Sequence, residues 1–356
     1  MLSFNLQAFI CLDSFYGTSI IGNEARHGSA GFSPLSEGFF DSLGTMFQSI
    51  GKILATFTIL LLFQLVWQGD VWAQDLEPRR WSHLPTGLNV IGVGSGWTDG
   101  DILFDPVLLI EDVTYDLYPL VVGYVRTFEV FGKSGRVDVA VPYASGRWRG
   151  LLDGEFTEVQ RRGFADPRVR FSMNLWGAPA LTGKEYVQYK REHPVTTTIG
   201  AALQIRVPLG EYTSERLINL GGNRWVFRPQ LGVLHQHHKW QFEVTGSVFL
   251  HQTNSEFWKG TELKQDPVWF VQAHGIYAFK PGWWASVSGG YAYGGNAYLD
   301  DVWKLNVRAR YIALSLGVSI SAHQSLKFVY FTKDTHVSSG GNTDALLAAW
   351  SINWGM

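Results

Sequence analysis

The chain has 356 residues, a formal net charge of −2 and a single cysteine, Cys11. With so balanced a charge it has no basic face for nucleic acid, so we exclude a nucleic-acid partner. The residues after Cys11 carry no thiol, which excludes a cysteine nucleophile and a thiolate metal site in them. Aromatic residues make up 15% of the chain. Membrane barrels place such residues in girdles at both lipid interfaces, so the composition favours a membrane protein.

The apolar run at residues 53–67 predicts a secretory signal peptide over residues 46–73. The run is shorter than the roughly 20 residues that a membrane-spanning helix needs. Lys52 precedes it, and residues 71–73 carry the small-residue pattern of a cleavage site. We expect cleavage after Ala73; the alternative is an uncleaved anchor helix.

The signal peptide divides the rest of the chain into three parts. Residues 1–45 precede it without any periodicity, which indicates a mis-assigned start or a disordered extension. Residues 74–83 are expected to form a short periplasmic segment. Residues 84–356 are expected to form one β-barrel domain.

The clearest strand pattern lies at residues 166–175. Side chains of a strand point alternately to its two faces, and here an Asp-Pro turn is followed by one polar and one apolar face: Arg168, Arg170, Ser172 and Asn174 against Val169, Phe171, Met173 and Leu175. In a soluble sandwich the apolar face would turn to a core. In a membrane barrel it would turn to lipid, and the arginines would face a lumen.

Twelve segments of alternating polarity follow one another along the chain. They are residues 88–97, 115–131, 136–143, 166–175, 196–207, 224–236, 240–252, 268–279, 283–293, 304–316, 325–332 and 345–354. Short connections follow the second, sixth, eighth and tenth segments, and long ones follow the third, fifth, seventh, ninth and eleventh. Outer-membrane barrels have short periplasmic turns and longer outer loops. We therefore predict an all-β fold, a transmembrane antiparallel outer-membrane β-barrel of about 12 strands, with periplasmic termini, in a Gram-negative type of cell.

Two segments depart from this pattern. The connection 177–194 is long on the side where short turns are expected, and residues 180–190 within it are a candidate interfacial helix. In segment 304–316 the polar face holds Arg308 and Arg310, and the same parity then becomes apolar at Ile312, Leu314 and Leu316. Either a β-bulge lies near residues 310–311 or the lumen is apolar at that depth.

Several stretches resemble a known family. They are residues 136–143, 165–181, 208–212, 217–225, 265–267 and 294–296, in that order. These are similar to the transporter family labelled for the meta-pathway of phenol degradation, and the resemblance covers roughly residues 84–354. It implies an outer-membrane barrel, often encoded with aromatic degradation pathways, that passes small apolar compounds. The chain departs from the usual aromatic last residue of such barrels, because Gly355 and Met356 follow Trp354; this bears on how the barrel-assembly machinery reads the last strand.

Charged side chains gather on the predicted lumen face. They are the candidate substrate-binding residues: Arg136, Asp138, Arg168, Arg170, Arg206, Arg224, Arg228, Glu243, Arg308 and Arg310. Arginine offers a fixed fork of donors to a carboxylate or phenolate, so such a wall would favour anions. The alternative is a network of paired arginines and acids that fills a narrow lumen.

Metal and catalytic chemistry have less support. His235 and His237 share one strand face, but no carboxylate lies nearby in the sequence, so we interpret them with His238 as a solvated turn. No G-x-S-x-G or comparable pattern accompanies His251 or His274. We therefore expect no enzyme and no cofactor.

The sequence thus predicts an outer-membrane channel for passive passage of small, apolar or aromatic compounds. Its expected partners are outer-membrane lipid, those solutes and the barrel-assembly machinery. An apolar solute needs an apolar patch, and the candidates are Phe257, Trp258, Ile312, Leu314 and Leu316. The alternatives are a non-conducting structural or interaction barrel and, with less support, an outer-membrane lipid hydrolase.

Overall fold

In a computed structural model of the chain, the structure is described for residues 76–102, 110–152, 154–335 and 341–355. The signal peptide and the extension predicted for residues 1–73 lie outside these ranges. The described residues form the helix α2 (Gly183–Glu192) and fourteen strands: β1 (Asn89–Ile102), β2 (Ile110–Val130), β3 (Lys133–Leu152), β4 (Glu155–Phe164), β5 (Arg168–Trp176), β6 (Val195–Arg206), β7 (Val226–His237), β8 (Trp240–His251), β9 (Leu263–Gln265), β10 (Val268–Lys280), β11 (Trp283–Leu299), β12 (Val302–Ser319), β13 (Gln324–Thr335) and β14 (Thr343–Trp354). Within the described ranges, no helix is long and apolar enough to cross a membrane.

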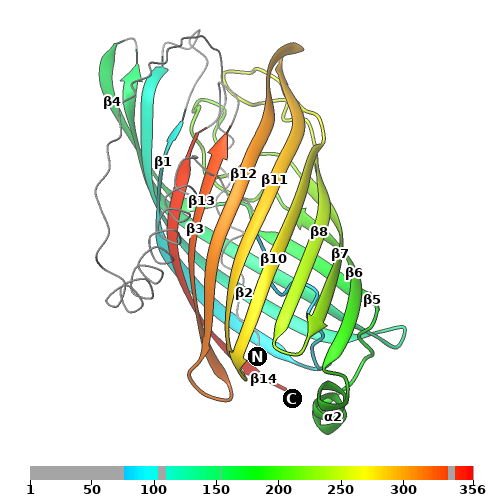
Figure 1. Cartoon of the computed structure of the whole chain (residues 1–356). Coiled ribbons are helices and arrows are strands. Elements are labelled where there is room, and N and C mark those ends of the chain that lie inside the picture. The colour runs from blue at the N-terminus through cyan, green and yellow to red at the C-terminus, as the bar shows by residue number, and fades with distance from the viewer. Residues whose placement is uncertain (1–75, 103–109, 153, 336–340, 356) are drawn as a thin grey trace, which may run out of the picture. The chain divides into compact units, whose positions relative to one another are not determined.

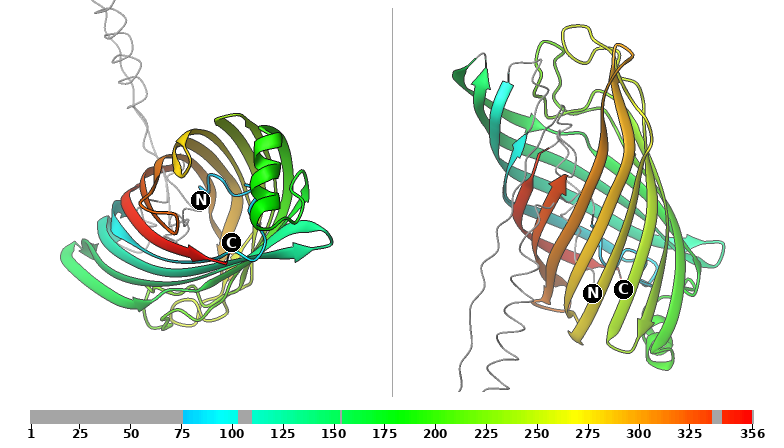
Figure 2. Two further views of the ribbon diagram at one scale, coloured as in Figure 1. Left: turned by 90° about the horizontal axis from the view of Figure 1, so that it is seen from below. Right: turned by 45° about the horizontal axis from the view of Figure 1, so that its top comes forward.

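Twelve of these strands close into an antiparallel ring (Figure 1 and Figure 2). The order around the ring is β1, β2, β3, β5, β6, β7, β8, β10, β11, β12, β13 and β14. The ring closes where β14 pairs with β1, from Trp354 opposite Asn89 to Thr343 opposite Gly100. The twelve predicted segments are these twelve strands, so the predicted fold class is confirmed.

The two ends of the barrel differ in their connections. The turn end carries the tight turns at residues 131–132, 238–239, 281–282 and 320–323. The loop end carries the long connections 207–225 and 252–267 (Figure 1). Helix α2 lies at the turn end, in the long connection between β5 and β6. A helix was expected there at residues 180–190.

Apolar side chains cover the outside of the wall, and polar side chains line the inside. In β7, Arg228 and Gln230 are buried while the neighbouring Leu231 is 59% exposed. Val271 on β10 and Val287 on β11 are 54% and 61% exposed. A soluble sandwich would bury such residues, so the exterior is a lipid-facing surface.

The strand β12 keeps one register against β11 from Gly317 to Val307, which contradicts the bulge considered near residues 310–311. The irregularities of this pairing lie farther along, between Gly294 and Ala297 and between Ala297 and Tyr298 of β11. Ala309 and its alternate neighbours are buried toward the lumen, whereas the outer face holds Arg308, Arg310, Ile312, Leu314 and Leu316. The outer face therefore changes from charged to apolar along one strand. The alternation of inward and outward side chains stays the same along its length.

The strand β4 forms a hairpin with β3 that extends beyond the ring (Figure 1). The second half of β3 pairs with β4, and its first half pairs with β5. Cross-strand ion pairs join Arg147 and Arg149 to Glu158 at 3.5 and 3.3 Å. The sequence predicts only a connection between residues 143 and 166, because a hairpin beyond the ring needs no apolar face for lipid and so lacks the alternation that marks the other strands.

Candidate functional site

Eight of the ten predicted lumen residues point into the barrel. They are Arg136, Asp138, Arg168, Arg170, Arg206, Arg224, Arg228 and Glu243. Arg308 and Arg310 lie on the outer face of β12, so the prediction that these two line the lumen is wrong. Arg308 instead lies over the ring of Tyr293 on β11, with its guanidinium carbon 5.8 Å from the ring centroid.

The chain just before β1 lies inside the barrel. We call residues 76–84 the N-terminal plug. It contacts walls on nearly opposite sides of the ring: the backbone N–H of Glu77 donates to Gln272 Oε1 on β10 at 2.9 Å, and the Arg80 guanidinium lies 3.0 Å from Asp138 on β3. Leu76, Glu77 and Trp81 have no exposed surface. Residues 74–83 are predicted from the sequence to form a short periplasmic segment, whereas the described part of that segment lies in the lumen.

Buried charges join the plug to the wall. Asp138 Oδ2 lies 3.0 Å from Arg80 Nη1 and 3.4 Å from Arg170 Nε, and Asp138 Oδ1 lies 3.4 Å from Arg136 Nε. Arg170 also donates to both carboxylate oxygens of Glu77. Charges this far from water need partners within reach. For Arg136, Asp138 and Arg170, the structure therefore shows the paired network, and the plug supplies two of its five charged residues, Glu77 and Arg80.

Apolar contacts anchor the same segment. Trp81 donates its indole N–H to Thr245 Oγ1 at 2.7 Å. Its ring lies against two glycines of the wall, and a Cβ atom added there would lie 2.1 Å from the ring at Gly200 and 2.0 Å from it at Gly232. Leu76 belongs to a buried cluster that includes Phe270 and Tyr311. The wall is thus shaped to receive these two side chains.

The arginines nearer the loop end have other partners. Arg224 donates to Gln265 Oε1 at 2.7 Å. Arg228 donates to Ser247 Oγ at 3.1 Å, and its guanidinium lies 4.5 Å from the ring centroid of Phe249. Arg228 also lies beside the plug, because Phe270 contacts both its guanidinium, at 5.4 Å from the ring centroid, and Leu76. A role of these arginines in anion selectivity stays a prediction.

Sequence reasoning missed several inward residues. Lys327 on β13 and His274 on β10 are 2% and 3% exposed and face the lumen. Both have the inward parity of strands that were predicted, so parity could have found them. Glu77 and Arg80 carried no such signal, because their partners on the wall lie 58 to 195 positions away in the sequence.

A serine and a histidine lie side by side in the lumen. His274 Nδ1 is 2.7 Å from Ser288 Oγ, and His274 Nε2 is 3.1 Å from Gln272 Oε1. A hydroxyl next to an oriented histidine is the arrangement of nucleophilic catalysis, but a substrate must be able to reach it. Ser288 is 1% exposed, and Gln272 also accepts the backbone N–H of Glu77 in the plug. We assign this group to the polar packing that holds the plug.

His83 fixes the plug at the turn end. Its Nε2 lies 2.8 Å from Pro179 O, and its backbone oxygen accepts from the Tyr186 hydroxyl of α2 at 2.9 Å. Its ring meets the rings of Tyr186 and Tyr189 edge-on, at 5.1 and 5.3 Å between centroids. Helix α2 therefore packs directly against the plug.

Acidification is expected to loosen this contact. Burial lowers the pKa of His83 to about 4, although its bond to Pro179 O favours the charged form. An undocked imidazole has a pKa of about 6.5. Above that pH both states are neutral and docking is at full strength. Between about 6.5 and about 4 only the undocked state gains a proton, so docking weakens as the pH falls, by up to about two orders of magnitude.

Thiol labelling measures this effect. Because the chain after Cys11 has no cysteine, a Leu76→Cys variant reports release of the plug. The ratio of its labelling rates at pH 5 and pH 7.5 is divided by the same ratio for Phe131→Cys, a cysteine at an exposed turn. This division corrects for the smaller fraction of thiolate at low pH. The normalised rate should rise on acidification, and His83→Gln should remove most of the rise. An equal rise in His83→Gln would show that another group is responsible.

Comparisons with known proteins agree with this fold. A family model described as "Putative MetA-pathway of phenol degradation" matches residues 112–338. The COG4313 outer membrane channel from Pseudomonas putida F1 is similar in structure, with a TM-score of 0.63 at 16% identity, over 79% of this chain and 100% of that chain. No curated protein matches the sequence.

Two further solved structures are less similar. The transport unit of the autotransporter AIDA-I from Escherichia coli has a TM-score of 0.44 at 10% identity, over 80% of this chain and 93% of that chain. The CymD monoaromatic hydrocarbon channel has a TM-score of 0.37 at 7% identity, over 77% and 89%. The likeness to the Pseudomonas putida F1 structure is the one that supports the fold, a closed outer-membrane type of barrel.

Proposed function

The chain belongs to the phenol-degradation family whose model it matches, and from this premise we propose that it is a channel of the outer membrane for small apolar or aromatic solutes. Passage is passive and needs no cofactor, and both termini lie in the periplasm. Its partners are the surrounding lipid, the solutes and the barrel-assembly machinery. The observation that carries the proposal is the plug: a polar lumen is closed by a separate piece of chain rather than by side chains of the wall.

A lumen closed in this way can open without unfolding the wall. The plug is held by hydrogen bonds and ion pairs from β3, β5, β8 and β10, none of which takes part in the pairing between strands. A barrel that served only as a scaffold would gain the same stability from apolar side chains, because a buried ion pair adds little over well-packed apolar residues. The rival function, a non-conducting interaction barrel, requires that the plug never leaves.

Planar-bilayer recording of the purified mature protein separates these functions. A channel shows unitary current steps, and a permanently closed barrel shows none. Steady absence of steps under voltage, at low pH and with aromatic solutes present would overturn the proposed function.

Selectivity tests the arginines of the wall. A unit charge about 5 Å from a passing ion is worth about 0.8 kcal/mol in a water-like dielectric. Arg168→Ala, which removes an inward charge, should therefore lower the anion-to-cation permeability ratio by about two- to fourfold, and less at high salt. Arg308→Ala is the matched control, because Arg308 faces outward. Equal reversal potentials in all three proteins would show that Arg168 does not act on permeating ions.

A further inference from the structure

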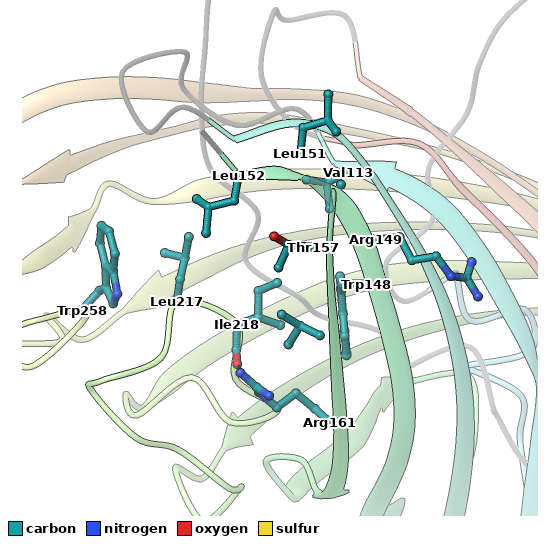
Figure 3. Close-up of a pocket in the computed structure, with 12 residues that line it drawn as sticks. Val113, Trp148, Arg149, Leu151, Leu152, Thr157, Arg161, Leu217, Ile218 and Trp258 are labelled. Carbon is teal, nitrogen blue, oxygen red and sulfur yellow. Dashed lines mark hydrogen bonds between the residues drawn. The ribbon is translucent and has the colours of Figure 1, made fainter. Parts of the chain in front are cut away.

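A hollow outside the lumen opens at the loop end, between the β3–β4 hairpin and the connections 207–225 and 252–267. Its volume is about 200 Å³. Figure 3 shows Leu217 and Ile218 in it, between Trp258 on one side and Trp148 on the other. Its lining is almost entirely apolar, so it offers little chemistry by which to select a ligand.

A larger depression, of about 760 Å³, lies in the lipid-facing surface and extends across β11, β12, β13 and β14. One cross-strand row explains it: Ala285 and Ala348 lie on either side of Leu316 and Phe328, so short side chains flank long ones. Pockets that hold small molecules measure roughly 300–1,000 Å³. Because the depression opens toward lipid, it is suited to an acyl chain.

Two arginines follow the depression along β12 toward the loop end. Arg308 and Arg310 lie on the exposed outer face, and neither forms an ion pair with a carboxylate of the described residues. Asp334 is the cross-strand partner of Arg310, but it is buried and lies beyond ion-pair distance of it. The surface beside the depression therefore carries two positive charges that an anion can reach.

These arginines lie at the depth of lipid headgroups. Ten residues separate Arg310 from the exposed Ile320 at the turn end. At about 3.4 Å per residue and a tilt of about 40°, that stretch spans about 26 Å across the membrane, and the apolar band of such a barrel is about 25 Å tall. Trp269 and Tyr293, which continue the cross-strand row of Arg308, are 60% and 52% exposed. Exposed aromatic residues mark the same boundary.

We propose that this face binds a lipid with an anionic phosphate headgroup. The phosphate lies at Arg308 and Arg310, and an acyl chain lies in the depression along Leu314 and Leu316. Arginine suits this role because its fork of donors matches the oxygens of a phosphate. The headgroup provides the preference, since the surrounding lipid is as apolar as the depression. This inference goes beyond the proposed function and requires only the lipid-facing wall.

Native mass spectrometry of the mature protein in detergent micelles measures the affinity for the first bound lipid. Dimyristoyl-phosphatidylglycerol and dimyristoyl-phosphatidylcholine have the same acyl chains, but only the first carries a net negative charge. A basic side chain near an anionic lipid is worth about fivefold in affinity, so two arginines should favour phosphatidylglycerol by about 30-fold. Equal affinities for the two lipids would overturn the site.

Variants locate this preference on the surface. Arg308→Gln combined with Arg310→Gln should lower the affinity for phosphatidylglycerol to that for phosphatidylcholine. Lys239→Gln combined with Lys280→Gln is the matched control, because it removes two exposed charges at the turn end, farther away than a Debye length of about 10 Å. It should leave the preference unchanged. An equal loss in both double variants would show general charge attraction instead of a site. The gel shift of the unheated protein confirms that each variant folds.

Inorganic phosphate distinguishes a lipid site from a site for free anions. Phosphate that displaces phosphatidylglycerol at equal concentration overturns the lipid site, whereas retention of the lipid supports it. Lipid binding is measured without passage of a solute. A protein that conducts but shows no lipid preference therefore loses this site alone, and one that shows the preference but never conducts loses the channel alone.

Discussion

Mature protein that lacks residues 74–83 is expected to conduct continuously, whereas the intact protein spends most of its time closed. The deletion removes the charges and the two apolar anchors that occupy the lumen, but it leaves all twelve strands of the ring. The strand pairing that determines barrel stability is untouched, so the protein should still shift on a gel when unheated. The measurement is the open fraction and the unitary current in a planar bilayer.

Point variants test the same expectation without shortening the chain. Glu77→Lys places a positive charge beside Arg170, and disrupting a buried pair costs about 3–5 kcal/mol. The open population should therefore rise by about two to three orders of magnitude. Arg147→Ala is the control, because it breaks a half-exposed ion pair on the β3–β4 hairpin and should change nothing. If the deletion and Glu77→Lys both conduct as the wild type does, the plug does not close the lumen.

The second large effect comes from the wall. Gly232→Val places a Cβ atom 2.0 Å from Trp81 Nε1, so the valine and the docked indole cannot occupy their sites together. Valine is a favourable strand residue, so the barrel should keep its fold and release the plug. Gly246→Val on β8 is the matched control, since nothing lies within 4 Å of the added Cβ atom.

Labelling and recording should agree for this pair. Gly232→Val should speed labelling of Leu76→Cys and raise the open fraction, and Gly246→Val should do neither. In a Trp81→Ala background, Gly232→Val should add little, because the clash it creates has been removed. Equal labelling rates in the two glycine variants would show that docking of the Trp81 indole does not depend on the space beside Gly232.

The sequence predicts the ring well, and physical reasons explain where it fails. A wall between lipid and a polar lumen imposes period-two alternation, and all twelve spanning strands carry it. At the loop end that rule weakens, because water or polar groups can lie on both sides of a strand. Arg308 and Arg310 lie there, so their charge alone did not reveal which face they occupy. The same reason hides β4, whose charged residues pair across a hairpin beyond the ring.

The plug could not be predicted from local patterns at all. Its nine residues form neither a helix nor a strand, and their partners are spread over β3, β5, β8 and β10. The candidate site was likewise predicted only in part. Parity correctly turned Arg136, Asp138 and Arg170 inward, but whether they bind a solute or a partner within the chain depends on Glu77 and Arg80, which only the three-dimensional structure brings to them.

The position of the plug next to the closing seam has a consequence for biogenesis. The plug leads directly into β1, and β1 completes the ring only when it pairs with β14, the last strand to be synthesised. The wall partners of the plug extend to Gln272 on β10, so its full set of contacts exists only late in insertion. The segment that precedes every strand of the ring is thus the one locked in last. A nascent barrel with an unclosed seam would have a water-filled interior, and sealing of the seam and docking of the plug would be coupled as the final step of maturation.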